Sequence, residues 1–284
     1  MGLLEGKVVL ITGGARGQGR AHAVESARAG ADVILLDITK HIDTVDYPLA
    51  NAEDMAETAK QVEALGRRVL TFDADVRDQS QLDAAVAAGI DEFGKIDALI
   101  ANAGIWARAP FWELSETAWN DSIDVNLTGV WKSAKALAPH MIERQAGSIV
   151  ITASVNAVEP GMNYGHYVAA KHGVLGLMKN IALELAPHGI RCNAICPASI
   201  LTPMTNQQKA WDMFAGHEGG TAEDMINAGY SYHALKGNTV LPPETIANTA
   251  IYLNSALASS VTGVTIPVDA GHLLLTGVNH NPVR

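Results

Sequence analysis

The sequence contains 284 residues, 48% hydrophobic and 5% aromatic with 26 glycines, a balance typical of an α/β protein rather than a β-sandwich. The net charge of −10 argues against nucleic acid or an anionic membrane as a partner, and no apolar run approaches the roughly 18 residues of a membrane span. A strand begins almost at the first residue, leaving no room for a signal peptide, and Cys192 and Cys196 lack redox or zinc-site spacing, so we expect a cytoplasmic protein.

Residues 7–12 (KVVLIT) have the pattern of a buried strand and run directly into a glycine-rich turn, after which a helix extends to about Ala29. Glycines here let the backbone turn tightly and approach a pyrophosphate, which the free N–H groups of the new helix would hold. A turn placed between a strand and a helix therefore predicts a dinucleotide site. The residues of the turn expected at the cofactor are Gly13, Arg16, Gly17, Gln18 and Gly19.

The next strand, residues 33–36, is closed by Asp37, near the spacing of about 20 residues expected for a ribose-binding carboxylate. A carboxylate there accepts hydrogen bonds from the adenosine 2′-hydroxyl and repels a 2′-phosphate, so NAD is expected rather than NADP. Arg16 argues mildly for NADP, but two negative groups in contact cost more than one flexible Arg returns. Ile38 is expected at the cofactor beside Asp37.

Residues 38–52 (ITKHIDTVDYPLANA) make a connection longer than the usual strand-to-helix loop of about 2–6 residues. It is either a structureless loop or a flap that folds over the adenosine side of the cofactor. Both interpretations stay open from the sequence.

Strands and helices continue to alternate beyond this connection. The third strand leads into Asp75 and Val76, which are expected beside the adenine. The fourth ends in Asn102, Ala103 and Gly104, a turn whose backbone would pass under the cofactor. This alternation predicts a doubly wound parallel sheet with right-handed crossovers and helices on both faces.

A long helix is predicted over about residues 116–144 and contains Asn126, whose amide would ordinarily face solvent or a backbone carbonyl. The fifth strand ends at Ser154, and the following helix carries Tyr167 and Lys171 on one face. An ammonium near a phenol lowers the phenol pKa from about 10, and a hydroxyl at the strand end can bond the same substrate oxygen. Although such pairs also occur as surface decoration, the dinucleotide turn favours acid–base chemistry on an alcohol or ketone oxygen.

After the sixth strand, Pro197, Ile200 and Thr202 are expected at the cofactor. Residues 204–241 then break the rhythm on the carboxyl-end side of the sheet, where ligands bind. We interpret them as a substrate lid, although the same apolar side chains would suit a peripheral helix pair. The side chains expected to form an apolar substrate pocket are Trp106, Met162, Trp211 and Phe214, with Phe111, Trp112 and Met213.

The chain ends with a last strand at residues 263–268 and a tail, residues 273–284, that we expect to be a free end rather than an arm to a neighbouring subunit. The histidines lack metal-ligand spacings, so no metal site is expected.

The residues described so far resemble the short-chain dehydrogenase/reductase family over about residues 7–271. The matching positions are Thr12, Gly13, Gly17, Gly19, Asp75, Asn102, Ala103, Gly104, Asn126, Ser154, Tyr167, Lys171 and the Pro197 stretch. The resemblance implies a single Rossmann-type domain over residues 1–284 with a sheet of about seven strands. It also implies a reversible alcohol–ketone oxidoreductase, usually a homotetramer.

Carried over by position, the family roles make Tyr167 the acid/base, and Ser154 the group that orients the substrate oxygen. Lys171 lowers the pKa of Tyr167 and holds the nicotinamide ribose. Asn126 anchors a water in the proton relay. Tyr167 and Lys171 therefore also count among the cofactor contacts, and Ser154 and Tyr167 among the substrate contacts.

Two positions depart from the family pattern, Gln18 in the glycine turn and Ala198 after the proline, and neither removes a catalytic group. Gln18, the long connection after Asp37 and residues 47–50 and 62–68 resemble a narrower actinobacterial branch, the carveol dehydrogenases and mycofactocin-coupled dehydrogenases. That resemblance implies a bound NAD that exchanges poorly under the extra loop, and electrons that leave through a redox peptide, mycofactocin.

The expected function is the NAD-dependent interconversion of a secondary alcohol and a ketone, with a hydrophobic cyclic, carveol-like terpenoid as substrate. A 3-oxoacyl thioester reductase would fit better if the pocket were open and lined by basic groups, and a steroid reductase is a further alternative. From another class, a non-catalytic NAD-binding sensor or scaffold stays open. NAD binding alone, however, does not require Ser154, Tyr167 and Lys171 together.

Overall fold

The computed structural model describes residues 2–279 and 281–283, which contain one seven-stranded sheet in the order β3-β2-β1-β4-β5-β6-β7. Every neighbouring pair of strands is parallel. The strands are β1 (Val8–Thr12), β2 (Asp32–Asp37), β3 (Val69–Asp73), β4 (Ala98–Ala101), β5 (Gly147–Thr152), β6 (Ile190–Pro197) and β7 (Thr265–Val268). The predicted doubly wound parallel sheet is confirmed.

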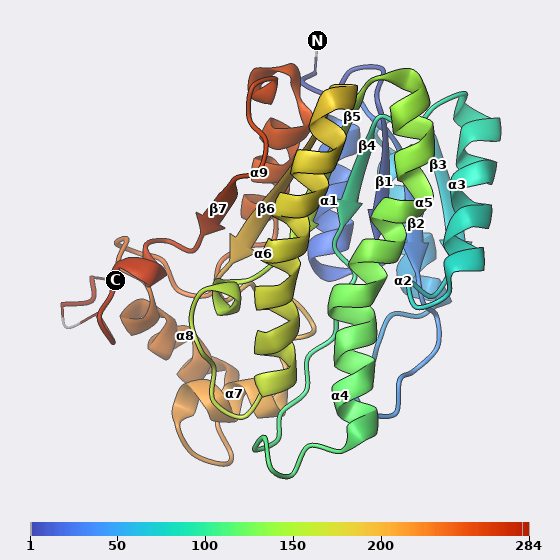
Figure 1. Ribbon diagram of the computed structural model, residues 1–284. Helices are drawn as coiled ribbons and strands as arrows, with labels where there is room; N and C mark the ends of the chain where they lie inside the picture. Colours follow the sequence, from blue (N-terminus) through green and yellow to red (C-terminus); the bar gives the residue numbers. More distant parts are fainter. Residues whose placement is uncertain (1, 280, 284) are drawn as a thin grey trace.

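Helices cover both faces of the sheet (Figure 1). α1 packs against α2 and α9 on one face, and α5 packs against α3 and α6 on the other. The α-helices are α1 (Gly17–Arg28), α2 (Ala52–Glu63), α3 (Gln79–Phe93), α4 (Glu116–Ile123), α5 (Gly129–Arg144), α6 (Gly165–Leu185), α7 (Gln208–Ala215), α8 (Ala222–Tyr232) and α9 (Glu244–Asn254). Short 3₁₀ turns are η2 (Val155–Ala157), η3 (Ala186–His188), η4 (Ala256–Ala258) and η5 (His272–Leu274). Within the described ranges, no helix is long and apolar enough to cross a membrane.

The side chains of β1 show how the sheet builds a core on each face. Val8 and Leu10 belong to the cluster packed against α3, α5 and α6, whereas Val9 and Ile11 belong to the cluster packed against α1, α2 and α9. Successive side chains of a strand point to opposite faces, and a parallel strand covered on both sides is therefore apolar throughout. This explains why the strands are continuous apolar runs.

The carboxyl ends of the strands meet at the edge toward which the arrowheads point in Figure 1. α7, α8 and the connection after β2 gather at the same edge. The strand order reverses between β1 and β4, because β2 and β3 lie on one side of β1 and all later strands on the other. Open α/β sheets bind ligands in the crevice at such a switch point.

The helix predicted over residues 116–144 is interrupted by a π-helical turn, η1 (Asp124–Thr128), between α4 and α5. The N–H of Gly129 donates to the carbonyl of Asp124, so the turn holds one residue more than a regular helix. Asn126 lies in this wide turn and is 0% exposed. The expectation of one regular helix was wrong here, because the turn is shaped by bonds to a loop far away in sequence.

The long connection after β2 contains no helix or strand before α2, yet it is packed. Ile42, Val45 and Tyr47 are at most 5% exposed and belong to the hydrophobic core. Asn51 ends the connection with a capping box, in which its side chain accepts from the N–H of Asp54. The connection is therefore irregular but fixed in place, and a loosely held loop is the wrong description of it.

The segment after β7 is not a free end. The N–H of Asn279 donates to the carbonyl of Ser231 at 2.7 Å, and the N–H of Gly237 donates to the carbonyl of Val283 at 2.9 Å. These backbone bonds attach the segment to α8 and to the loop that follows it, so the expectation of a free tail was wrong. His280 and Arg284, which belong to the predicted tail, lie outside the described residues, as does Met1.

Candidate active site

A pocket opens at the carboxyl edge of the sheet, and every residue predicted to contact the cofactor lines it. These residues are Gly13, Arg16, Gly17, Gln18, Gly19, Asp37, Ile38, Asp75, Val76, Asn102, Ala103, Gly104, Tyr167, Lys171, Pro197, Ile200 and Thr202. The remaining catalytic candidates, Asn126 and Ser154, line the same space. Residues predicted from separate stretches of the sequence therefore line one pocket.

The glycine-rich turn is shaped by contacts that exclude side chains. A Cβ on Gly19 would lie 1.8 Å from the carbonyl oxygen of Gly13. Gly13 itself has a φ of +67°, and a Cβ there would lie 2.8 Å from the Cα of Ala103. α1 begins in this turn, and the side chain of Arg16 makes no capping bond to it. The first N–H groups of α1 therefore face the pocket as an anion site suited to a pyrophosphate.

Asp37 is held with its carboxylate at the pocket. Its two oxygens accept hydrogen bonds from the N–H groups of Ala15 at 2.9 Å and Ile38 at 2.8 Å. Burial raises the pKa of Asp37 to about 6, and those two bonds and the charge of Arg16 oppose the rise. The carboxyl group is therefore mostly ionised at neutral pH.

Arg16 bears on the choice between NAD and NADP. Its guanidinium donates to the carbonyl of Pro48 in the connection after β2. The one basic group that favoured a 2′-phosphate is thus engaged elsewhere, while Asp37 remains to repel that phosphate. The residues of this end of the pocket fit NAD.

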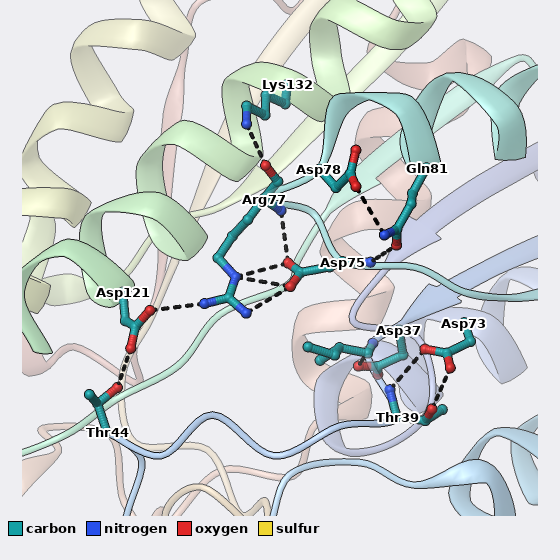
Figure 2. Close-up of polar contacts among 11 residues, drawn as sticks. Asp37, Thr39, Thr44, Asp73, Asp75, Arg77, Asp78, Gln81, Asp121 and Lys132 are labelled. Carbon is teal, nitrogen blue, oxygen red and sulfur yellow. Dashed lines mark hydrogen bonds and ion pairs between the residues drawn. The ribbon is translucent and has the colours of Figure 1, made fainter. Parts of the chain in front are cut away.

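On the adenine side, Asp75 is oriented by Arg77, as Figure 2 shows. The guanidinium of Arg77 donates to both carboxylate oxygens of Asp75, with Nη2 to Oδ2 at 2.7 Å, and the N–H of Arg77 adds a bond of 2.9 Å. Nη1 of Arg77 also donates to Asp121 of α4 at 2.9 Å. The other oxygen of Asp121 accepts the hydroxyl of Thr44 at 2.7 Å. A chain of polar contacts therefore ties the connection after β2 to the loop that carries Asp75.

The reacting groups lie between β5 and α6. Lys171 is 3% exposed, its ammonium donates to the carbonyl of Thr152 at 2.8 Å, and it lies 5.6 Å from the centre of the Tyr167 ring. Burial lowers the pKa of Lys171 to about 8. Burial also raises the pKa of Tyr167 to about 12, and a hydrogen bond with the Ser154 side chain opposes the rise.

The pKa of Tyr167 thus moves in the direction opposite to the prediction. The groups of the protein alone do not produce the expected phenolate, because burial disfavours the anion more than its neighbours stabilise it. Without bound cofactor, Tyr167 is therefore a neutral phenol at pH 7, the form that donates a proton to a substrate oxygen.

Asn126 lines the pocket and bonds to the loop that follows β4. Its Oδ1 accepts from the N–H of Ile105 at 3.0 Å, and its Nδ2 donates to the carbonyls of Ile105 at 3.0 Å and Ser122 at 2.9 Å. A Cβ on Gly104 would lie 2.9 Å from Oδ1 of Asn126 and 3.9 Å from Nζ of Lys171. Because Ile105 and Ser122 take up the hydrogen bonds of this amide, Asn126 holds the loop after β4 beside Lys171.

The substrate end contains only some of the predicted apolar side chains. Trp106, Met213 and Phe214 line the pocket. Met162 is instead 79% exposed, and the indole of Trp211 lies outside the lining and donates to Asn206 at 3.2 Å. The expectation for these two was wrong, since the loop before α6 turns Met162 outward and the Trp211 indole is directed to Asn206 rather than into the pocket. Phe111 and Trp112 are also more than 70% exposed and pack against each other.

Sequence reasoning missed three aromatic residues of the pocket, Tyr47, Tyr164 and Tyr232. Tyr164 lies 5.7 Å from Trp106 and 6.3 Å from Tyr167, measured between ring centres. It is the N-cap residue of α6, directly before the helix that carries Tyr167, and this nearness in sequence was a usable signal. Tyr232 ends α8, and no local pattern indicates where that helix points. Within the described part of the chain, no group of three or more His, Cys, Asp or Glu is placed to hold a metal ion.

Comparison with known proteins agrees with this geometry. Residues 7–213 match the family model for short chain dehydrogenases. A (-)-trans-carveol dehydrogenase of Rhodococcus erythropolis is 43% identical over 278 residues, which cover 96% of this chain and 100% of that protein.

Among solved structures, the chain is similar to dehydrogenases that contain NAD. A carveol dehydrogenase from Mycobacterium avium in complex with NAD is 42% identical, with a TM-score of 0.94 over 97% of this chain and 100% of that one. A short chain dehydrogenase from Mycobacterium paratuberculosis bound to NAD is 36% identical, with a TM-score of 0.87 over 96% and 100% of the two chains.

The family match therefore extends from the glycine turn through the tyrosine–lysine helix and into α7. It favours an enzyme over a non-catalytic scaffold, since Ser154, Tyr167 and Lys171 meet in the pocket that fits NAD. The chain belongs to the short-chain dehydrogenase/reductase family and is an NAD-dependent alcohol oxidoreductase of that family.

Proposed function

We propose that the protein interconverts a hydrophobic cyclic secondary alcohol, of the size and shape of carveol, and its ketone. The observation that carries the proposal is that Tyr167 shares its pocket with four aromatic side chains, Trp106, Tyr164, Phe214 and Tyr232, of which Tyr164 lies beside it. An aromatic lining with few charges favours an apolar ring over a sugar or a carboxylic acid. The similarity to carveol dehydrogenases supports the same class.

In the proposed mechanism, Oη of Tyr167 exchanges a proton with the substrate oxygen, and the Ser154 hydroxyl donates a hydrogen bond to that oxygen. Bound NAD supplies the hydride acceptor or donor and, when oxidised, a positive ring that favours the Tyr167 phenolate. Lys171 adds positive charge to the same side and holds the nicotinamide ribose, and Asn126 keeps the neighbouring loop in register. In this proposal Asn126 also anchors a water in the proton relay.

The alternatives within this chemistry are less well supported. A 3-oxoacyl thioester reductase needs basic groups for a phosphorylated carrier, but the Lys and Arg side chains that line the pocket are Lys171 and Arg16, which bond to carbonyls of Thr152 and Pro48. A steroid would require the α7–α8 region, which we propose to be a substrate lid, to open further.

The test is a panel of purified alcohols with an artificial electron acceptor present. We expect carveol and related monocyclic alcohols to give the highest kcat/KM, because their ring fills the aromatic end. Higher kcat/KM for 3-hydroxysteroids or 3-hydroxyacyl thioesters than for every monocyclic alcohol would contradict the proposal.

We also propose that the connection after β2 holds NAD in place, so that the cofactor exchanges slowly and passes electrons to a redox peptide such as mycofactocin. Support comes from its packing, because Ile42, Tyr47 and Leu49 line the pocket, and from the polar chain Thr44–Asp121–Arg77. A cofactor covered in this way leaves only when the segment lifts.

Replacing Thr44 by Val is expected to speed NAD release about tenfold, since it removes one hydrogen bond from the segment at nearly constant volume. Release is measured by gel filtration of NAD-loaded protein followed by absorbance of the retained cofactor. Thr249→Val in α9, far from this segment, is the matched control and should behave as wild type. Equal release from both variants would show that this contact does not restrain the segment.

We further propose a homotetramer located in the cytoplasm. Apolar side chains exposed on neighbouring helices, Trp119 on α4, Trp131 on α5 and Leu183 on α6, support a subunit interface. Light scattering of the purified protein tests the tetramer by its mass.

A further inference from the structure

Tyr232 is presented to the substrate end of the pocket by the last turn of α8. Its ring meets Phe214 of α7 edge to face, with ring centres 5.8 Å apart and planes at 86°. The two residues belong to the lid region and line the same pocket as Tyr167. A substrate ring that extends from Tyr167 to this part of the lining would contact them.

The position of Tyr232 is set by His272, which lies in η5 after the last strand. The imidazole stacks on the Tyr232 ring, with centres 3.8 Å apart and planes at 26°. Its Nδ1 lies 2.9 Å from the carbonyl oxygen of Tyr232 and its Nε2 lies 2.7 Å from Oε1 of Glu159. Glu159 belongs to the loop before α6, so His272 joins three segments that are remote in sequence.

Both polar partners of His272 are acceptors. A carbonyl oxygen and a carboxylate cannot donate, so a neutral imidazole, with one N–H, satisfies only one of them, whereas the imidazolium satisfies both. Stacking of the cation on the phenol ring adds a favourable contact. The arrangement therefore requires His272 to carry a positive charge.

The surroundings of His272 favour this charge. Burial lowers the pKa of His272, but the bonds to Glu159 and to the Tyr232 carbonyl, with the charges of Glu159 and Asp269, raise it above its ordinary value. The other titratable groups facing it come from α8, Tyr232 itself and His233, and burial lowers the pKa of His233, which stays neutral. The net surroundings of His272 are thus anionic.

Further hydrogen bonds join the end of α8 to the segment that follows β7. The N–H groups of Ala234 and Leu235 both donate to the carbonyl of Ala270, at 3.1 and 2.9 Å, and the Asn279 side chain donates to the carbonyl of His233 at 3.0 Å. The end of α8 is therefore fastened to the C-terminal segment, whereas the direction of the Tyr232 ring depends on its stacking against His272.

We propose that Tyr232 is a substrate-positioning residue whose ring is fixed by a cationic His272 clamped between Glu159 and α8, so that substrate affinity depends on the charge of His272. The identity of the ring that packs on Tyr232 rests on the proposed function. When His272 loses its proton, one of its two bonds is lost and Tyr232 becomes mobile. KM for the alcohol then rises, whereas kcat, which follows Tyr167, has no step at this pH.

The first test is an NMR titration of the histidine ring signals. We expect His272 to titrate above the ordinary histidine value of about 6.5, and Glu159→Gln to lower the His272 midpoint by about one pH unit. A His272 midpoint at or below that ordinary value would overturn the proposal. This measurement needs no substrate, so its result is independent of whether a carveol-like alcohol is the right one.

The second test follows KM and kcat against pH with the best alcohol of the panel. KM in the wild type should rise about fivefold across the His272 midpoint, and in Glu159→Gln the rise should begin at lower pH. Tyr232→Ala should raise KM about tenfold at all pH values and abolish the step, whereas Tyr232→Phe, which keeps the ring, should retain it. His217→Gln serves as control, and thermal unfolding checks that each variant is folded. A flat KM profile in the wild type, or an unchanged KM in Tyr232→Ala, would refute the role of Tyr232.

Discussion

Replacing Tyr167 by Phe is expected to lower kcat by about 10²- to 10⁴-fold, the usual contribution of a positioned acid or base. The ring keeps its packing, and only the hydroxyl that exchanges a proton with the substrate is lost. NAD affinity should change little, because the phosphate and adenosine contacts lie at the other end of the pocket. Steady-state kinetics in both directions, with NAD binding followed by fluorescence, measure the two effects separately.

Tyr252→Phe is the matched control, since Tyr252 is a partly exposed residue of α9 and its loss of a hydroxyl should leave kcat unchanged. The wild-type rate of alcohol oxidation should also rise with pH, because the pKa of Tyr167 is raised to about 12 and the phenolate is the form that accepts the proton. Retention of more than a tenth of the activity in Tyr167→Phe would remove Tyr167 from the mechanism.

The second large effect is expected from Gly19→Ala, which should weaken NAD binding by up to about 100-fold, the size of effect that a misplacement of roughly 1 Å can have on a reaction that depends on geometry. A Cβ at this position would lie 1.8 Å from the carbonyl oxygen of Gly13, so the turn or the start of α1 must move. The overpacking should also cost about 1–3 kcal/mol of the free energy of unfolding. Calorimetric titration with NAD and thermal unfolding measure both.

Gly176→Ala is the control for this substitution. Gly176 lies on the exposed side of α6, where an added Cβ meets nothing within 4 Å, so alanine should stabilise the helix by up to about 1 kcal/mol and leave NAD binding intact. If Gly19→Ala bound NAD like the wild type, the close approach of turn and phosphate would not be the basis of the site.

The structure brings the predicted residues into one pocket where the prediction rested on short patterns of neighbouring residues. The glycine turn, Asp37 after β2, and Tyr167 with Lys171 on one helix are short patterns, and each acts through the element that carries it. Their convergence followed from the fold, because the carboxyl ends of parallel strands share one edge.

The sequence prediction was wrong where a side chain is placed by contacts with an element far away in sequence. Met162 and Trp211 have the apolar character of pocket residues but point elsewhere, whereas Tyr232 lines the pocket because His272, 40 residues later, holds it there. The direction of the Tyr167 pKa was also missed, since burial is a property of the packed protein rather than of a tyrosine–lysine spacing.

By itself, the sequence determined the alternation of strands and helices, the glycine-rich turn and the preference for NAD, and it supplied the reacting groups that we propose. These depend on backbone freedom, side-chain periodicity and charge, which act over a few residues. The tertiary structure alone decided the π-helical turn that holds Asn126, the packing of the connection after β2, and the aromatic end of the pocket. Those features arise from contacts between remote segments, whose free energy exists only once the chain has folded.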